Sequence, residues 1–460
     1  MKRYTSLIIG LLFLVSCQNY LNVQPQGMVL PKTDEEFAAI IHTHLRNIEG
    51  GGDDHIIGNM EDISEREGCA DDLHANISIG RNLVPYAGSD LLNKKQSDYR
   101  ETWQVIKDCN IVIENIQGRE SEIALNTLSA AYAIKAICYY NLIRDFCEPW
   151  DAGKASSQLG LPIVDHFDVT SQPGRSDLEE TARYALQLFD NSIALHPSDP
   201  LFIFTEDIVK AFKARLLFWI EDWENCKALC QEVMETSKIR LTPIDQYEEV
   251  INSPTERKGE ILLRSHINNS SELDWYFSYI KGYIASRPAS SRLIRLFGEE
   301  PEKDIRFEIS FDGRRCNTKV PEVRLRISEL LLMSAECEYH LGNEQAALDQ
   351  INLLRENRIR GVVPIRLTNL PPLHEKDKIT EDAEGKEITP LLQLIFDERR
   401  KELYMEGDRW FELKRNGRPE WWIITNGLKY VTRKYLYTAP IYKRDVDMNE
   451  GMVQNPGYIY

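Results

Sequence analysis

The chain has 460 residues, of which 42% are apolar, and a formal net charge of −17. This length allows one large domain or two to three smaller ones, and the apolar fraction supports a large buried core. An acidic surface repels phosphate backbones and anionic lipid heads, so neither nucleic acid binding nor membrane binding through a basic patch is expected.

The amino terminus has the pattern of an exported lipoprotein. Lys2 and Arg3 precede an apolar run of nine residues, 7 to 15, and the tetrad Leu14-Val15-Ser16-Cys17 resembles a lipobox. A membrane-spanning helix needs roughly 20 apolar residues, and no later run approaches that length. The sequence therefore predicts a signal peptide over residues 1–16 and lipid attachment, such as palmitate, at Cys17. The alternative is an ordinary signal peptide with a coincidental cysteine.

Helical periodicity dominates the rest, which predicts a mainly α fold in one domain, residues 17–460. Small residues recur twelve positions apart in two places, as Ala214 and Cys226 and as Ala335 and Ala347. Small side chains let two antiparallel helices pack closely, and both patterns resemble the tetratricopeptide repeat. Such helix pairs would form a short α-solenoid, an architecture that favours binding over catalysis.

Four long stretches lack regular periodicity: 48 to 96, 149 to 175, 238 to 323 and 360 to 387. Loops of this length in a compact domain are uncommon unless they carry function or small elements of their own. We expect residues 48–96 and 238–323 to be insertions in the helical scaffold. With a few short strands, these insertions would form the ligand-binding face.

Aromatic and polar side chains gather in these two insertions. Aromatic rings offer flat platforms to the apolar faces of sugars, while carboxylate, amide and guanidinium groups bond to hydroxyls. The three tyrosines of the second insertion, at spacings of three and four, equally fit one buried face of a helix. The candidate ligand-binding residues are Asp71, Asp72, Arg81, Asn82 and Tyr86 in the first insertion and Trp275, Tyr276, Tyr279 and Tyr283 in the second.

Short motifs match one known family in order and spacing. Residues 17–25 resemble its mature start, Tyr99 and Trp103 its first long helix, and residues 159–164 the strand after its second helix. The most specific match is Glu398-Arg399-Arg400-Lys401-Glu402-Leu403 with Glu406-Gly407-Asp408-Arg409 and Leu413-Lys414-Arg415. The carboxy-terminal motifs Ala439-Pro440-Ile441 and Gln454-Asn455-Pro456-Gly457-Tyr458 also match. Over nearly its whole length the chain resembles the SusD/RagB family of outer-membrane nutrient-binding lipoproteins.

This resemblance implies a SusD-like α-solenoid, lipid-anchored in the cell outer membrane and facing the exterior. It implies that the protein binds a nutrient, in the first place an oligosaccharide, and delivers it to a SusC-like TonB-dependent transporter. A peptide ligand, as in RagB-like uptake lipoproteins, is the alternative. A surface glycosidase is a more distant one, because the resemblance implies no enzymatic activity.

The charged signature, residues 398–415, places Glu398, Glu402 and Glu406 on one helical face with arginines in reach. We interpret it as a structural ion-pair network and expect no catalytic residues. Cys226 and Cys230 lie one helical turn apart without a second ligand pair, so core packing is favoured over a metal. No cofactor is expected; a structural calcium at Asp53, Asp54, Asp71 and Asp72 would lack the EF-hand spacing.

Overall fold

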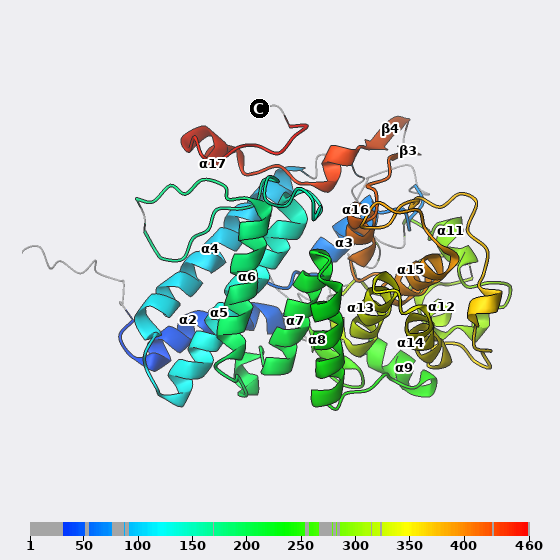
Figure 1. The fold of residues 1–460 in the computed structure, drawn as a ribbon, viewed down its shortest axis with the longest axis horizontal. Coiled ribbons are helices and arrows are strands. Elements are labelled where there is room, and N and C mark those ends of the chain that lie inside the picture. Colours follow the sequence, from blue (N-terminus) through cyan, green and yellow to red (C-terminus); the bar gives the residue numbers. More distant parts are fainter. Residues whose placement is uncertain are drawn as a thin grey trace, which may run out of the picture.

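The computed structural model describes residues 31–50, 55–75, 87, 92–168, 170–253, 257–265, 278, 282, 286–313, 315–322, 324–425 and 427–458. Helices dominate these residues, and the strands form two short antiparallel pairs (Figure 1). The prediction of a mainly α fold is confirmed. No helix in the described part of the chain combines the length and hydropathy that a membrane span requires.

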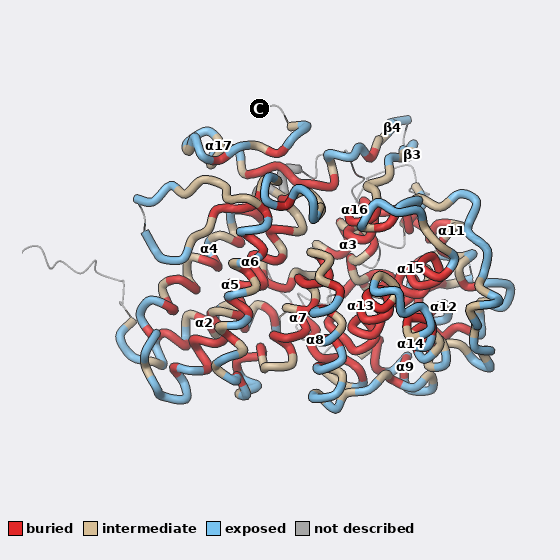
Figure 2. The backbone as a smooth tube through the Cα atoms, in the orientation of Figure 1, coloured by how far each residue is buried: buried red, intermediate tan, exposed pale blue. Residues whose placement is uncertain are grey.

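A four-helix unit forms one side of the molecule (Figure 1). It contains α2 (Asp34–Gly50), α4 (Leu92–Ile116), α5 (Glu122–Phe146) and α6 (Leu178–Ile193). Helix α5 is buried nearly all round because α2, α4 and α6 pack against it, as Figure 2 shows. Alanines on several of its faces permit these close approaches, and Ser121 caps its first turn by accepting from the Ala124 amide.

The two predicted helix pairs are present. Helices α7 (Glu206–Trp219) and α8 (Trp223–Thr236) form the first, and α13 (Ile327–His340) and α14 (Glu344–Glu356) form the second. Helix α8 packs against α13, so the pairs continue one another. All four small residues of the twelve-residue spacing are fully buried, which confirms the predicted helix pairs.

Two further helices carry the charged signature, and the strands are short. Helix α15 (Pro390–Glu402) packs on α13 and α14, and α16 (Asp408–Arg415) follows it. Strand β1 (Ile261–Arg264) pairs with β2 (Arg324–Arg326), and β3 (Trp421–Thr425) with β4 (Leu428–Thr432). The predicted strand at residues 159–164 makes only an isolated bridge, from Leu159 to Asp177.

The predicted insertions contain more regular structure than their sequences indicate. Residues 48–96 include α3 (Met60–Cys69) and the first residues of α4. The described residues of 238–323 include β1, three α-helices and one 3-10 helix. The remaining elements are α9 (Ile244–Asn252), α11 (Ser291–Arg295), α12 (Ile305–Ser310), α17 (Lys443–Met448), η1 (Pro200–Phe202), η2 (Pro301–Lys303), η3 (Leu367–Asn369) and η4 (Lys434–Tyr437).

The glutamates of the charged signature lie inside the protein and pair with cations from distant segments. The Glu402 carboxylate binds the guanidinium groups of Arg326, Arg358 at 2.9 Å and Arg306 at 3.3 Å. Burial opposes ionisation of Glu402, but these three arginines hold its pKa well below the usual range of a carboxyl. Glu398 and Glu406 have similar partners. The interpretation of the signature as a structural network is confirmed.

Removal of the Glu402 carboxylate tests this network. We expect Glu402→Ala to lower the free energy of unfolding by about 3–5 kcal/mol, because it leaves buried arginines without a counter-charge. Glu308→Ala is the matched control, since the Glu308–Arg360 pair on the surface is 40% and 49% exposed. The control should lose less than about 1 kcal/mol in denaturant unfolding. Equal losses in the two variants would contradict the assignment.

Candidate functional site

Two of the nine predicted ligand-binding residues, Asp71 and Asp72, lie in the described part of the chain. Both are buried just after α3, with exposures of 7% and 0%. Cys17 and the other predicted site residues lie outside the described residues, so their roles stay predictions: Arg81, Asn82, Tyr86, Trp275, Tyr276, Tyr279 and Tyr283. The described residues that flank them nevertheless show how the two insertions are attached.

The ends of the two insertions are joined to each other. Leu73 and Ala289 form an antiparallel bridge, the His74 amide donates to the Pro288 carbonyl at 2.8 Å, and the Ser290 amide donates to the Asp72 carbonyl at 2.7 Å. The chain positions of Arg81, Asn82 and Tyr86 begin shortly after this bridge, and those of the aromatic group end shortly before it. We call residues 71–75 and 286–292 together the loop-base face.

A buried arginine and an apolar cluster support this face from below. Arg287 donates from Nε to the His74 carbonyl and from Nη1 to the Gly68 carbonyl, both at 2.8 Å. Its own carbonyl accepts from the Asn317 side chain at 2.9 Å. Beneath these bonds lies a cluster of buried apolar side chains: Met60, Leu73, Ala289, Leu293, Phe297, Phe311, Tyr404 and Met405. These contacts hold the described ends of both insertions on the scaffold.

Asp71 and Asp72 connect the loop-base face to the charged signature. Arg409 donates from Nε to Asp71 at 2.8 Å, and Arg400 donates from Nε to Asp72 at 2.5 Å. Burial raises the pKa of both carboxyls, but Arg400 and Arg409 outweigh it at Asp71 and hold the pKa of that group well below its usual range. At Asp72 burial and the neighbouring Asp71 prevail, so its pKa is raised.

These pairings change the interpretation of the two aspartates. The sequence analysis treats them as ligand partners, yet their carboxylates point inward to arginines of α15 and α16. Their position fixes the end of the first insertion, so we assign them to the support of the face and not to the groups that a ligand reaches.

Two side chains on the face were not among the sequence candidates. The exposed His74 ring accepts from the Ser291 amide at Nε2, 3.1 Å away, and Arg292 is 36% exposed with its Nη1 3.9 Å from Asp71. Burial and the nearby Arg315 and Arg292 lower the pKa of His74. Neither residue belongs to a periodic or repeated pattern, so the sequence carries no signal that marks them.

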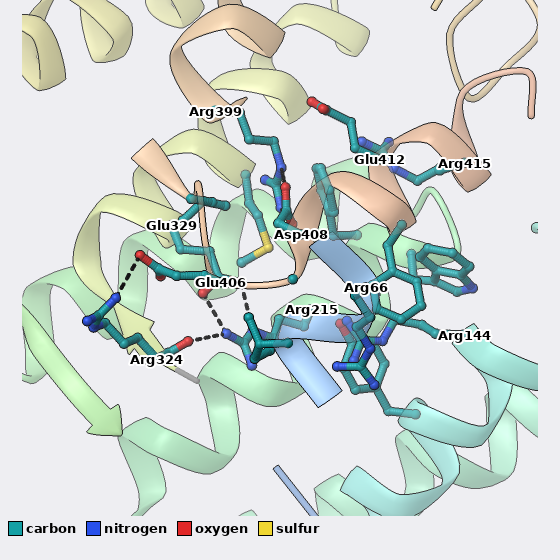
Figure 3. Close-up of a pocket in the computed structure, with 18 of the residues that line it drawn as sticks. Arg66, Arg144, Arg215, Arg324, Glu329, Arg399, Glu406, Asp408, Glu412 and Arg415 are labelled. Atoms are coloured by element: carbon teal, nitrogen blue, oxygen red, sulfur yellow. Dashed lines mark hydrogen bonds and ion pairs between the residues drawn. The ribbon is translucent and has the colours of Figure 1, made fainter. Parts of the chain in front are cut away.

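A small pocket of about 70 Å³ lies between α3, α5, α7 and the charged signature (Figure 3). Arg399 pairs with Asp408 at 2.5 Å, and Arg215 pairs with Glu329 at 2.6 Å. Burial raises the pKa of Glu412, another lining residue, to about 7, although Arg409 opposes the shift. Small-molecule sites usually enclose 300–1,000 Å³. At about 70 Å³ the pocket is smaller than such sites.

The described residues contain no group of three or more His, Cys, Asp or Glu side chains arranged to hold a metal ion. Cys226 and Cys230 are both fully buried, with their sulfur atoms 4.0 Å apart. They pack between the helices of the first repeat, as the sequence analysis favours.

Glu67 on α3 gives this region a pH dependence that can be measured. Its carboxylate accepts from the Gly407 amide at 2.9 Å, and burial, reinforced by Asp72, raises its pKa to about 8. The folded protein therefore holds a proton that the unfolded chain releases near pH 4.5, so this group lowers stability as the pH rises from about 4.5 to 8.

We expect Glu67→Gln to gain stability relative to the wild type over this pH range, with little difference at pH 4. Denaturant unfolding at a series of pH values measures the gap. Glu356→Gln, a change at an exposed residue of α14, is the control and should follow the wild type throughout. A wild-type curve that runs parallel to that of Glu67→Gln would show that Glu67 ionises normally.

Comparisons with known proteins agree with this fold. Residues 312–458 match the model of the SusD family. A curated relative, the SusD-like protein P25 of Formosa agariphila, is 20% identical over 89% of each chain. Among solved structures, a putative sugar binding protein from Bacteroides vulgatus superimposes with a TM-score of 0.69 and 20% identity, covering 94% of this chain and 100% of that one. A laminarin binding SusD-like protein gives 0.59 and 16%, covering 92% and 99%.

The matched segment contains the charged signature with its arginine clamps, and the structural neighbours cover the helical scaffold from end to end. The family model, the curated relative and the structural neighbours together support membership in the SusD/RagB family.

Proposed function

We propose that this protein is a surface lipoprotein that captures an oligosaccharide and passes it to a SusC-like TonB-dependent transporter in the outer membrane. Family membership supports the general role, and the relatives that are named for binding sugar and laminarin support a saccharide as the ligand. The lipid anchor at Cys17, the outward orientation and the transporter partner rest on the sequence pattern and the resemblance.

The observation that carries this proposal is the joining of the two insertions at the loop-base face. Leu73 and Ala289, more than two hundred residues apart in the chain, are bridged directly. The described ends of the two chain segments that contain Arg81 and Trp275 therefore lie side by side. A sugar held there would stack on aromatic rings and bond to guanidinium and amide groups, including the half-buried Arg292.

In the proposed mechanism the protein binds its ligand without changing it chemically. The helical scaffold supplies a rigid support, the insertions supply the contacts, and the anchored protein delivers its cargo by moving against the transporter. A ligand that is passed on must be released again, so a modest affinity built from a few stacked rings suits this role better than a deeply enclosed site.

Calorimetric titration of the chain from residue 18 onward tests the ligand class. We expect saturable binding of at least one oligosaccharide from a panel of laminarin, maltose, cellulose and xylan oligomers, and none of mixed oligopeptides. Binding of peptides with no response to any glycan would replace the saccharide with a RagB-like peptide ligand.

The same titration locates the site. Trp275→Ala should weaken binding by about 1–3 kcal/mol if the indole is a stacking platform. Leu201→Ala removes an exposed side chain from η1 and should leave the affinity unchanged. Wild-type affinity in the Trp275 variant, with an unchanged melting temperature, would move the site away from the second insertion.

A further inference from the structure

An open groove of about 740 Å³ lies on the surface away from the loop-base face. Four segments and Lys434 of η4 line it: residues 149–158 after α5, the turn between α7 and α8, the turn at 381–385, and residues 414–418 at the end of α16. None of these belongs to the two insertions. The volume falls within the range of small-ligand sites, 300–1,000 Å³.

The lining residues are held by contacts with one another and with residues behind them. The Trp223 indole donates to Glu384 at 2.8 Å and stacks on His340, with ring centres 4.2 Å apart. The Lys414 ammonium group donates hydrogen bonds to the Arg144 carbonyl at 2.5 Å and to the Cys147 carbonyl at 2.7 Å. On the other wall the Gln158 side chain donates to the Pro149 carbonyl at 2.8 Å, beside the half-buried Trp150. The groove is therefore preformed.

One carboxylate in the groove has no role in these contacts. Within the part of the chain that the structure describes, the half-buried Glu221 side chain makes no hydrogen bond and no ion pair. Burial raises the pKa of Glu221 to about 8, Arg415 opposes this shift, and Glu384 and Asp382 reinforce it. The carboxyl can therefore both donate and accept hydrogen bonds near neutral pH.

The second helix pair shows what the fold needs at this position. The turn between α13 and α14 has the same backbone hydrogen bonds as the turn between α7 and α8. In the first of these turns the amides of Gly342 and Asn343 donate to the carbonyls of Tyr339 and Glu338. In the other, the amides of Glu221 and Asp222 donate to the carbonyls of Phe218 and Leu217. The left-handed position is Gly342, at φ +81°, in the second pair and Glu221, at φ +61°, in the first.

Glycine adopts this conformation freely, whereas a residue with a Cβ atom is strained there. Glutamate at this position thus costs stability, and its carboxylate forms no compensating hydrogen bond or ion pair with the described residues. A strained residue with an unpartnered, partly buried carboxylate in a preformed groove is typical of a ligand-binding position.

One guanidinium nitrogen of Arg415, on the groove wall, also lacks a hydrogen-bond partner among the described residues. Arg415 pairs with Glu336 through Nη2 at 2.5 Å and lies over the Phe218 ring at 4.3 Å. Its Nη1 is buried and has no hydrogen-bond acceptor among the described residues. A buried donor without an acceptor is usually satisfied by a water or ligand oxygen.

We propose that this groove is a second saccharide site, separate from the loop-base face, in which a neutral sugar ring lies against Trp150 and bonds to Glu221. Five acidic and five basic side chains line the groove, so it does not select a strongly charged ligand. Aromatic rings beside groups that donate and accept suit the hydroxyls and apolar faces of a sugar. The choice of a saccharide as the ligand rests on the proposed function. The location of the site rests on the groove and on Glu221 and Arg415.

Fluorine NMR of the chain labelled with 5-fluorotryptophan tests this proposal, with Trp150→Phe and Trp223→Phe to assign the two groove resonances. The probes are laminarihexaose, maltohexaose, cellohexaose and xylohexaose. We expect at least one of them to shift the Trp150 resonance in a saturable way. The shift should persist in Trp275→Ala, because the two sites are separate.

Glu221→Gly separates binding from folding. It should weaken the Trp150 response by about tenfold, through loss of a hydrogen-bonded carboxyl. It should also raise the melting temperature, because glycine relieves the left-handed strain. Glu224→Ala changes an exposed carboxylate three residues away and should leave both quantities as in the wild type.

Three results would overturn the proposal. One is a Trp150 resonance that no probe moves at millimolar concentration, even while calorimetry detects binding at the loop-base face. A second is an undiminished response in Glu221→Gly. The third is a lower melting temperature in Glu221→Gly, which would assign Glu221 to the fold. In contrast, loss of calorimetric binding at the loop-base face with an intact Trp150 shift would contradict the proposed function and leave the groove site in place.

Discussion

Buried ion pairs between the charged signature and distant segments determine how the rest of this molecule is arranged. Arg400 and Arg409 hold Asp72 and Asp71, and Glu402 holds three arginines from other parts of the chain. Each charge inside the protein has lost its hydration, so each is tolerable only with its partner in place. The backbone segments that carry the partners are therefore fixed relative to α15 and α16.

The charged signature therefore holds the loop-base face in place through its ion pairs. The Asp72 carbonyl accepts a hydrogen bond from the Ser290 amide, and the Asp72 carboxylate accepts one from Arg400. One residue thus ties the end of the first insertion to the second insertion and to the scaffold. The groove at Glu221 depends on the same elements from their other end, since Lys414 and Arg415 at the end of α16 form part of its wall.

The repeated and periodic features were predictable from the sequence because each depends on residues close in the chain. Small residues at a spacing of twelve predict helix contacts, and Ala335 and Ala347 are both fully buried. Glutamates at a spacing of four predict a charged helical face. The partners of that face, Arg306, Arg326 and Arg358, come from far along the chain, and no local pattern identifies them.

Helix α3 shows a different limit of sequence reasoning. It begins with a capping box at Asn59 and Asp62, but its buried face includes Glu65 and Glu67, which resemble surface residues in a periodicity analysis. Asp71 and Asp72 show a related limit, because carboxylates that bind a ligand and carboxylates that bind buried arginines have the same sequence appearance. Glu221 was not singled out, since its significance depends on a comparison of backbone angles between two repeats.

Amide hydrogen exchange in Arg400→Gln tests most directly whether the signature holds the loop-base face. The account predicts that the amides of His74 and Ser290, which bond across the two insertions, exchange much faster than in the wild type. The amides of α5, which has no contact with this clamp, should remain as slow as before. Unchanged protection at His74 and Ser290 would contradict the account, and so would equally faster exchange in every helix.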